Sequence, residues 1–276
     1  MAWESTGEVR MPEEVDGRPV REIARKEFLS KKNLRKITVP ACVTEVGDWA
    51  FAYCDNLHTA VFEGRPVFGR AVFLECKGLR FLYVGTTPEN AESDAQAVAA
   101  LLAAAVTVAD APYLLDAKEA GSAEWLQKWD ARMQVILESP DTEGYSKQVL
   151  CGEEDYGSTD LTAYISNRRK WKVRLAFLRL LYPLGLGQSM RQLLESYLRE
   201  HTKGCESEET WQVVLVEHGD ERLYYQLFAD LGCITEENFD GLLTDVREDK
   251  PELRAYLMRY KSEHFGISDF FGGLDL

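Results

Sequence analysis

Three stretches can be aligned with one another and decide how the first part of the chain folds: VREIARKEFLSKKNLRKITVP at 20–40, VTEVGDWAFAYCDNLHTAVFE at 43–63 and VFGRAVFLECKGLRFLYVG at 67–85. We call them the first, second and third repeats. Several apolar positions recur in them at steps of 23 and 22 residues: Phe28, Phe51 and Phe73; Leu34, Leu57 and Leu79; Ile37, Ala60 and Leu82; Val39, Phe62 and Val84. Self-similarity at a fixed period predicts units that stack on one another.

Each repeat combines two patterns. The final L-x-x-I-x-V alternates as a short strand with one buried face would, and the preceding A-F-x-x-C-x-x-L predicts a compact helical turn whose Phe and Cys point inward. Gly47 and Gly69 occupy the same repeat position, which predicts a tight backbone bend there. Because one unit cannot bury its apolar side alone, we predict a short parallel β-solenoid, with a partial unit beginning at Val9.

The pattern V-x-x-I-G-x-x-A-F-x-x-C-x-x-L-x-x-I-x-x-P, most complete at 43–62, resembles the BspA-like (Treponema-type) leucine-rich repeats. The resemblance extends from residue 9 to residue 85. Lys31 departs from it by replacing the Cys of the first repeat, and Ala60 is small for a core strand position, where bulky Phe62 is expected to fill the space. The resemblance implies a leucine-rich-repeat fold and binding of other proteins. Many members of that family are bacterial surface proteins.

Strand alternation also predicts which side chains face outward from the sheet. The outward positions that we take as candidates for partner binding are Lys36, Thr38, Thr59, Val61, Phe81 and Tyr83. Phe81 and Tyr83 have two interpretations. They are aromatic anchors for a partner, or they are covered by the segment that follows, and the second is favoured because the last repeat of an array needs a cap.

Strand-like alternation ends at Thr86-Thr87-Pro88, and the remainder of the chain reads as helical. A helix at 171–182 is apolar over most of its surface and is expected to be central and buried. The other helices are predicted at 90–109, 123–138, 188–201, 208–217, 221–231, 236–246 and 251–262. Short links predict helical hairpins. Leu223 and Leu227 recur as Leu253 and Leu257, a step of 30 that resembles degenerate ankyrin-type repeats, although their T-P-L-H signature is absent.

The predicted fold class is therefore α+β with two domains. The first, 1–87, is a leucine-rich-repeat β-solenoid, and the second, 88–276, is an all-α, ankyrin-like helical-hairpin domain. Charge is divided unevenly between the two parts: residues 1–85 hold 13 basic and 12 acidic side chains, whereas the rest holds 19 and 34. The net charge of −14 argues against binding to a nucleic-acid backbone and favours a protein partner.

Membrane insertion and secretion are not expected. The longest uncharged apolar run, 97–109, has 13 residues, whereas a bilayer span needs roughly 20. The N-terminus has neither the basic nor the apolar region of a signal peptide. Six cysteines are scattered without a C-x-x-C pair, which indicates reduced thiols. We expect a cytoplasmic protein, or a surface or secreted one if a leader is missing from this sequence.

No catalytic or cofactor motif is recognisable, so we predict a non-enzymatic interaction or scaffold protein without a metal or cofactor. The alternative is a hydrolase or a metal- or ligand-binding domain that uses Glu153, Glu154 and Asp155 in the loop CGEEDYGSTD. The favoured interpretation of that loop is an acidic lead into a helix. Residues 168–174 carry five positive charges, which we expect to pair internally, with this loop as candidate partner, in preference to binding nucleic acid.

Overall fold

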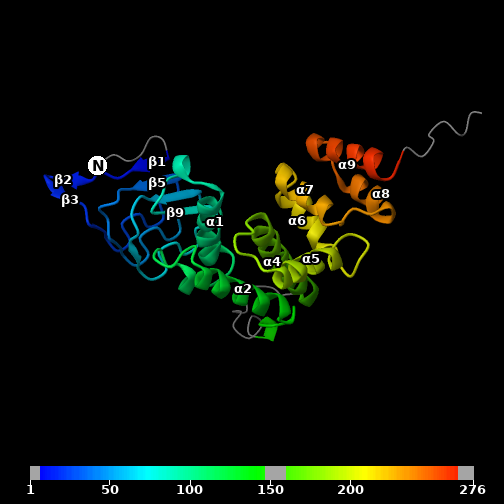
Figure 1. Ribbon diagram of the computed structural model, residues 1–276, viewed down its shortest axis with the longest axis horizontal. Coiled ribbons are helices and arrows are strands. Elements are labelled where there is room, and N and C mark those ends of the chain that lie inside the picture. The colour runs from blue at the N-terminus through cyan, green and yellow to red at the C-terminus, as the bar shows by residue number, and fades with distance from the viewer. Residues whose placement is uncertain (1–6, 147–159, 267–276) are drawn as a thin grey trace, which may run out of the picture. The chain divides into compact units, whose positions relative to one another are not determined.

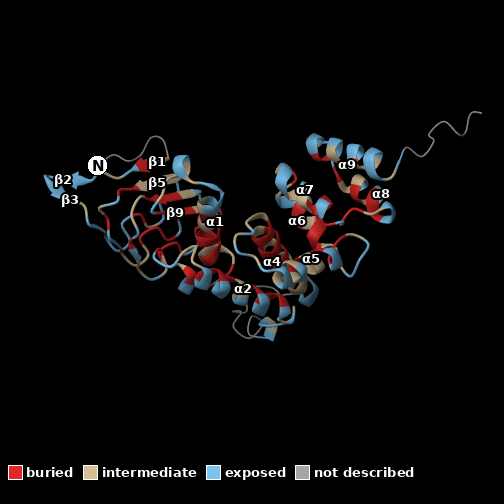
Figure 2. Ribbon diagram, viewed as in Figure 1, coloured by how far each residue is buried: buried red, intermediate tan, exposed pale blue. Residues whose placement is uncertain are grey.

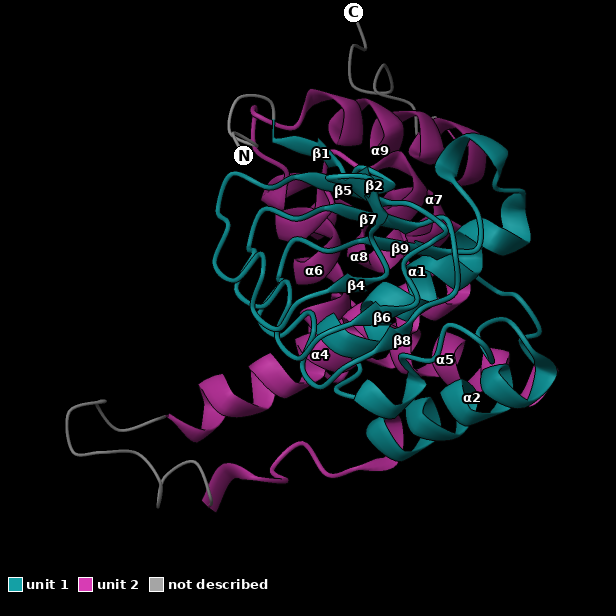
Figure 3. Cartoon of the chain, turned by 90° about the vertical axis from the view of Figure 1, so that its left-hand side faces the viewer, with its two compact units in different colours: residues 1–136, 182–187 teal, residues 137–181, 188–276 magenta. Residues whose placement is uncertain are grey.

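A computed structural model describes residues 7–146 and 160–266 and shows an α+β fold with parallel sheets (Figure 1). By compactness the chain forms two units, Met1–Ile136 with Tyr182–Gly187, and Leu137–Leu181 with Gln188–Leu276 (Figure 3). The change from strands to helices falls near the expected position, between Val84 and Ser93. The compact units nevertheless divide the chain elsewhere than at 87/88, because the first helix after the strands packs on the last strand.

The main sheet of the first unit has one strand from each of the three repeats and one from the partial unit before them. Its parallel strands lie in the order β1 (Glu8–Arg10), β5 (Lys36–Val39), β7 (Thr59–Phe62) and β9 (Phe81–Val84). Lys36 pairs with Thr59 and Thr59 with Phe81, so the observed register follows the steps of 23 and 22 residues in the sequence. The alternation also holds, since Ile37 and Val39 are buried and Lys36 and Thr38 are partly exposed.

A second, shorter parallel sheet runs along the other side of the repeats. It consists of β4 (Glu22–Ile23), β6 (Glu45–Val46) and β8 (Val67–Phe68). Before it, β2 (Glu14–Val15) and β3 (Arg18–Pro19) form an antiparallel hairpin. Asp16 and Gly17, at its tip, both have positive φ angles, of 53° and 73°, which suits the tight turn of a two-residue hairpin.

Turns, and not the expected helical turns, join the two sheets. Lys26, Trp49 and Ala71 have positive φ angles, and they occupy one repeat position. Ser30, Tyr53 and Glu75 do so at a second position. Alternate amides in these segments donate to the next repeat, for example Phe28 N to Ala50 O at 2.8 Å. A helix would use those amides for its own hydrogen bonds, so bonding between repeats replaces it.

The phenylalanine column forms the interior of the repeats, as predicted. In Figure 2 the buried parts of the repeats are red. The ring of Phe51 stacks on Phe28 and Phe73, with centroids 5.1 and 5.5 Å away. Phe62 packs edge-on against Phe51, with the ring centroids 6.3 Å apart. Gly47 is required by a close approach and not by a bend, because a Cβ there would lie 2.6 Å from the backbone nitrogen of Arg25.

Helices follow the last strand within the first unit. A 3-10 turn at Pro88–Asn90 precedes α1 (Ser93–Thr107), which is shorter than the expected 90–109 and packs on β9. A further turn, Pro112–Leu114, leads towards α2 (Ala123–Glu138), whose bounds match the prediction. Trp125 and Trp129 are buried on this helix, and the indole nitrogen of Trp125 donates to Leu114 O at 2.9 Å.

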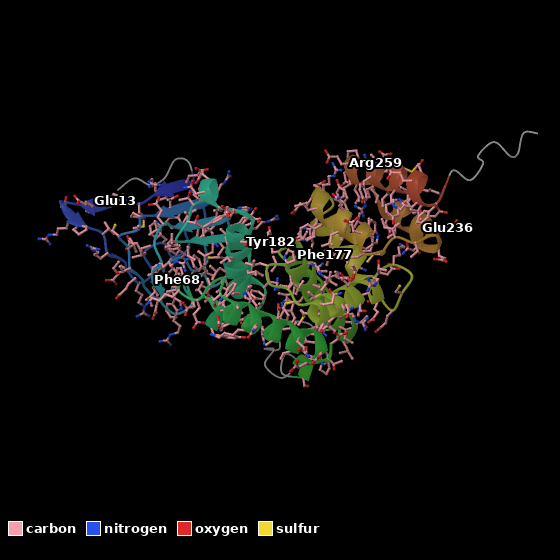
Figure 4. The ribbon with its side chains drawn as sticks, in the orientation of Figure 1. Glu13, Phe68, Phe177, Tyr182, Glu236 and Arg259 are labelled. Carbon is pink, nitrogen blue, oxygen red and sulfur yellow. The ribbon has the colours of Figure 1, made fainter. Side chains whose placement is uncertain are left out.

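The described part of the second unit is helical. At its centre is α4 (Leu161–Leu181), which begins ten residues before the expected start and packs against α5, α6 and α7. Val173, Leu175 and Phe177 are buried, as the apolar pattern predicted, and Phe177 is labelled in Figure 4. The remaining helices lie within a few residues of their expected bounds: α5 (Gln188–Glu200), α6 (Glu209–Glu217), α7 (Arg222–Asp230), α8 (Glu236–Asp245) and α9 (Pro251–His264).

Candidate functional site

The outward face of the main sheet is the candidate interaction surface. Lys36, Thr38 and Thr59 are partly exposed on β5 and β7, where strand alternation was expected to place them. At the margins of this face, Arg10 pairs with Glu63 at 2.8 Å and Lys36 approaches Glu89 at 3.9 Å. Exposed pairs of this kind contribute little to stability, so their charges stay available to a partner.

The other half of this face is covered by α1. Val61 and Tyr83 are only 1% and 6% exposed and form one buried cluster with Ala99 of that helix. The alanine-rich sequence of α1 explains the fit, because small side chains let the helix backbone approach the strands closely. Of the two interpretations of Tyr83, the structure shows the covered one, and Val61 and Tyr83 therefore leave the candidate surface.

Phe81 lies at the boundary between the covered and the open halves. It is partly buried, with Tyr83 stacked at 6.0 Å and His58 tilted against it at 6.1 Å. Tyr182, labelled in Figure 4, lies edge-on to it at 6.4 Å. Burial raises the pKa of Tyr83, as does, to a smaller extent, the nearby charge of Glu89. The aromatic residues thus pack mainly against each other, and the open part of the face is polar.

The first repeat also carries a cluster of exposed basic side chains, which was not identified from the sequence. Exposed basic side chains crowd the first repeat: Arg21, Arg25, Lys26, Lys31, Lys32 and Arg35. Arg25 and Lys26 both lie over the Trp49 ring, at 5.0 and 4.8 Å from its centroid. The sequence does carry this signal, because residues 21–36 contain seven basic and two acidic residues. The net charge of +1 for residues 1–85 as a whole does not reveal it.

Within the described residues, the basic segment of α4 pairs with acidic side chains of the same unit, as expected. Asp141 accepts from Arg169 at 2.8 Å and from Lys172 at 2.7 Å. Arg174 binds both carboxylate oxygens of Glu217 at 2.7 Å. Burial would raise the pKa of Asp141, but the hydrogen bonds from Lys172 and Arg169 outweigh it and lower that pKa. Through these ion pairs, the basic residues of α4 stabilise the second unit.

The acidic loop with Glu153, Glu154 and Asp155 lies outside the described residues. Within 7–146 and 160–266, no group of three His, Cys, Asp or Glu side chains is placed to hold a metal ion. Burial raises the pKa of the Cys76 and Cys233 thiols to about 12, which makes them unreactive. In the same ranges no helix combines the length and the hydropathy that crossing a bilayer requires.

Comparison with known proteins gives one partial likeness. No family model and no curated protein matches this chain. Part of the chain is similar to a solved structure described as "Crystal structure of T. pallidum Leucine Rich Repeat protein (TpLRR)", with 29% identity and a TM-score of 0.27. The match covers 27% of this chain and 36% of that one, so the chain spans little more than a third of that protein. It is a link to leucine-rich repeat proteins and no more.

Proposed function

We propose that this chain is a non-enzymatic protein-interaction or scaffold module. Its first unit would present a short leucine-rich-repeat solenoid, and its helical unit would serve as an ankyrin-like scaffold. The observation that carries the proposal is the register of the main sheet, in which neighbouring strands set Arg10 beside Thr38 and Lys36 beside Thr59 on one face. An ordered array of side chains on a rigid sheet is suited to recognising another folded surface.

The open part of the face suggests how a partner would bind. Arg10 is well exposed and Lys36 is partly so. In the strand register Thr38 is the neighbour of Arg10, and Thr59 is the neighbour of Lys36. A partner with carboxylates and carbonyl oxygens at strand spacing would replace the weak ion pairs at the margins of the face with its own contacts.

The free, buried thiols of Cys54, Cys76 and Cys233 favour the proposed cytoplasmic location, because such thiols persist in a reducing compartment.

Site-specific photo-crosslinking tests this proposal. A benzophenone amino acid at Thr38 reports on the open face, and the same residue at the exposed Lys77, in the third repeat but outside the main sheet, is the matched control. We expect a discrete, protease-sensitive and nuclease-resistant adduct from position 38 that is absent from position 77. Identical adducts at both positions, or none at position 38, would contradict the proposal.

A further inference from the structure

The backbone bonds that join successive repeats follow one rule. Three alternate amides of each repeat donate to three alternate carbonyls of the next. Between the first and second repeats the donors are Lys26, Phe28 and Ser30, and the acceptors are Asp48, Ala50 and Ala52, at 3.1, 2.8 and 2.8 Å. Between the second and third they are Trp49, Phe51 and Tyr53, bonded to Arg70, Val72 and Leu74 at 3.0, 3.0 and 2.7 Å.

In the third repeat the same positions are Ala71, Phe73 and Glu75. None of their amides has a hydrogen-bond acceptor anywhere in the described ranges 7–146 and 160–266. After this repeat the chain continues through β9 into α1, so no fourth repeat follows in the stack. The third repeat therefore ends in an edge whose donors are spaced to pair with one more segment.

A groove of about 500 Å³ lies along this edge, entirely within the first unit. One wall is the segment from Phe68, labelled in Figure 4, to Leu74, whose exposed fraction is 41%. The opposite wall comes from the end of α1 and the turn after it, with Val106, Pro112 and Leu115. The groove thus combines an unpaired backbone edge with walls that are apolar except at Arg70 and Asp110.

We propose that this groove binds a segment of a partner protein that folds into the same successive turns and takes the place of a fourth repeat. Carbonyl oxygens of three alternate residues would accept from Ala71, Phe73 and Glu75, and apolar side chains would pack against Leu74 and Leu115. The interface continues one that the chain already makes twice between its own repeats. It is separate from the outward face of the main sheet.

The geometry of the donors selects this occupant. The intervening amides bond within these segments, as Leu29 N does to Lys26 O and Leu74 N to Ala71 O, so each segment is a run of turns. A segment folded into the same turns presents its alternate carbonyls to all three amides. A helix cannot do so, because its carbonyls are used internally. Pairing through main-chain atoms with apolar pockets beside them is the arrangement by which sheet edges recruit peptides.

The probe is a labelled peptide with the sequence of residues 69–77, GRAVFLECK, carrying Cys76→Ser and blocked at both ends, because the second repeat already binds this segment within the chain. We expect saturable binding to the full chain. By NMR, hydrogen exchange at the amides of Ala71, Phe73 and Glu75 should slow by about tenfold or more on binding. A scrambled peptide should produce neither effect. No saturation up to about 1 mM, or binding without protection of these amides, would overturn the proposal.

A pair of variants adds a second test. Leu74→Asp places a charge on the groove wall and should weaken peptide binding by about tenfold or more. Tyr53→Asp is the control, because Tyr53 is similarly exposed, at 44%, but lies in the second repeat outside the groove. Equal affinity of both variants would overturn the proposal. So would a dimer of the chain that the peptide dissociates, since the occupant would then be a second copy. The amide measurement on the unsubstituted chain stands even if a variant fails to fold.

Discussion

Removing the middle ring of the phenylalanine column should cost far more stability than removing the ring at its end. Phe51 is fully buried, with stacked neighbours on both sides and Phe62 against its edge. Phe28 stacks on one neighbour and is slightly exposed. Large-to-small substitution of a buried Phe costs about 3–5 kcal/mol. We therefore expect a loss of about 5 kcal/mol for Phe51→Ala and about 3 kcal/mol for Phe28→Ala, because aromatic pairs add about 0.5–1.5 kcal/mol each.

The assay is urea unfolding, monitored by hydrogen exchange at the amides of β5 and β7. Exchange at these amides reports on the first unit alone, which is needed because a chain with two compact units need not unfold in one transition. If Phe51→Ala proves too unstable to purify, Phe51→Leu replaces it, with an expected loss of about 1–3 kcal/mol. If Phe51→Ala lowers the free energy of unfolding by no more than Phe28→Ala does, the idea that these rings stabilise the stacking of successive repeats is refuted.

Three further predictions concern single sites. Ser30→Gly should raise the free energy of unfolding by about 0.5–1 kcal/mol in urea titrations, because Ser30 has a φ of 58° that glycine adopts without strain; a loss of stability would contradict this. Asp141→Asn should cost about 3 kcal/mol at neutral pH, since it leaves Lys172, only 3% exposed, without its anion. The lowered pKa of Asp141 stabilises the fold above about pH 4 and that contribution is lost as the pH falls further, so thermal melts of this variant should be less acid-sensitive than those of the unsubstituted chain; equal acid sensitivity would count against the pairing. Among the described cysteines, the exposed Cys205 should react first with a thiol reagent, and Cys76 only on unfolding; mass spectrometry showing early labelling of Cys76 would contradict its burial.

The stacking of the repeats was predictable because the same residue types recur at fixed spacing in the sequence. Phe28, Phe51 and Phe73 are equivalent in the sequence and adjacent in the structure. The bounds of α2 were also predictable, since its apolar face and the Pro140 that follows act locally. Local patterns were enough wherever neighbours in sequence determine the structure.

Features that depend on distant contacts were not predictable. Which strands α1 covers depends on how closely its alanines approach Val61 and Tyr83, and no periodicity encodes that distance. Among the described residues Lys172 pairs with Asp141, thirty-one residues away, and charge alone did not single out that residue. The open edge of the third repeat is likewise invisible in the sequence, because it consists of backbone amides that every repeat possesses.

The most direct test of the stacked-repeat account is a set of NMR nuclear Overhauser contacts among ring and methyl protons. The account predicts contacts of Phe51 with both Phe28 and Phe73, and of Tyr83 with the methyl group of Ala99. A direct contact between Phe28 and Phe73, or a Tyr83 ring that is open to solvent and far from Ala99, would contradict it.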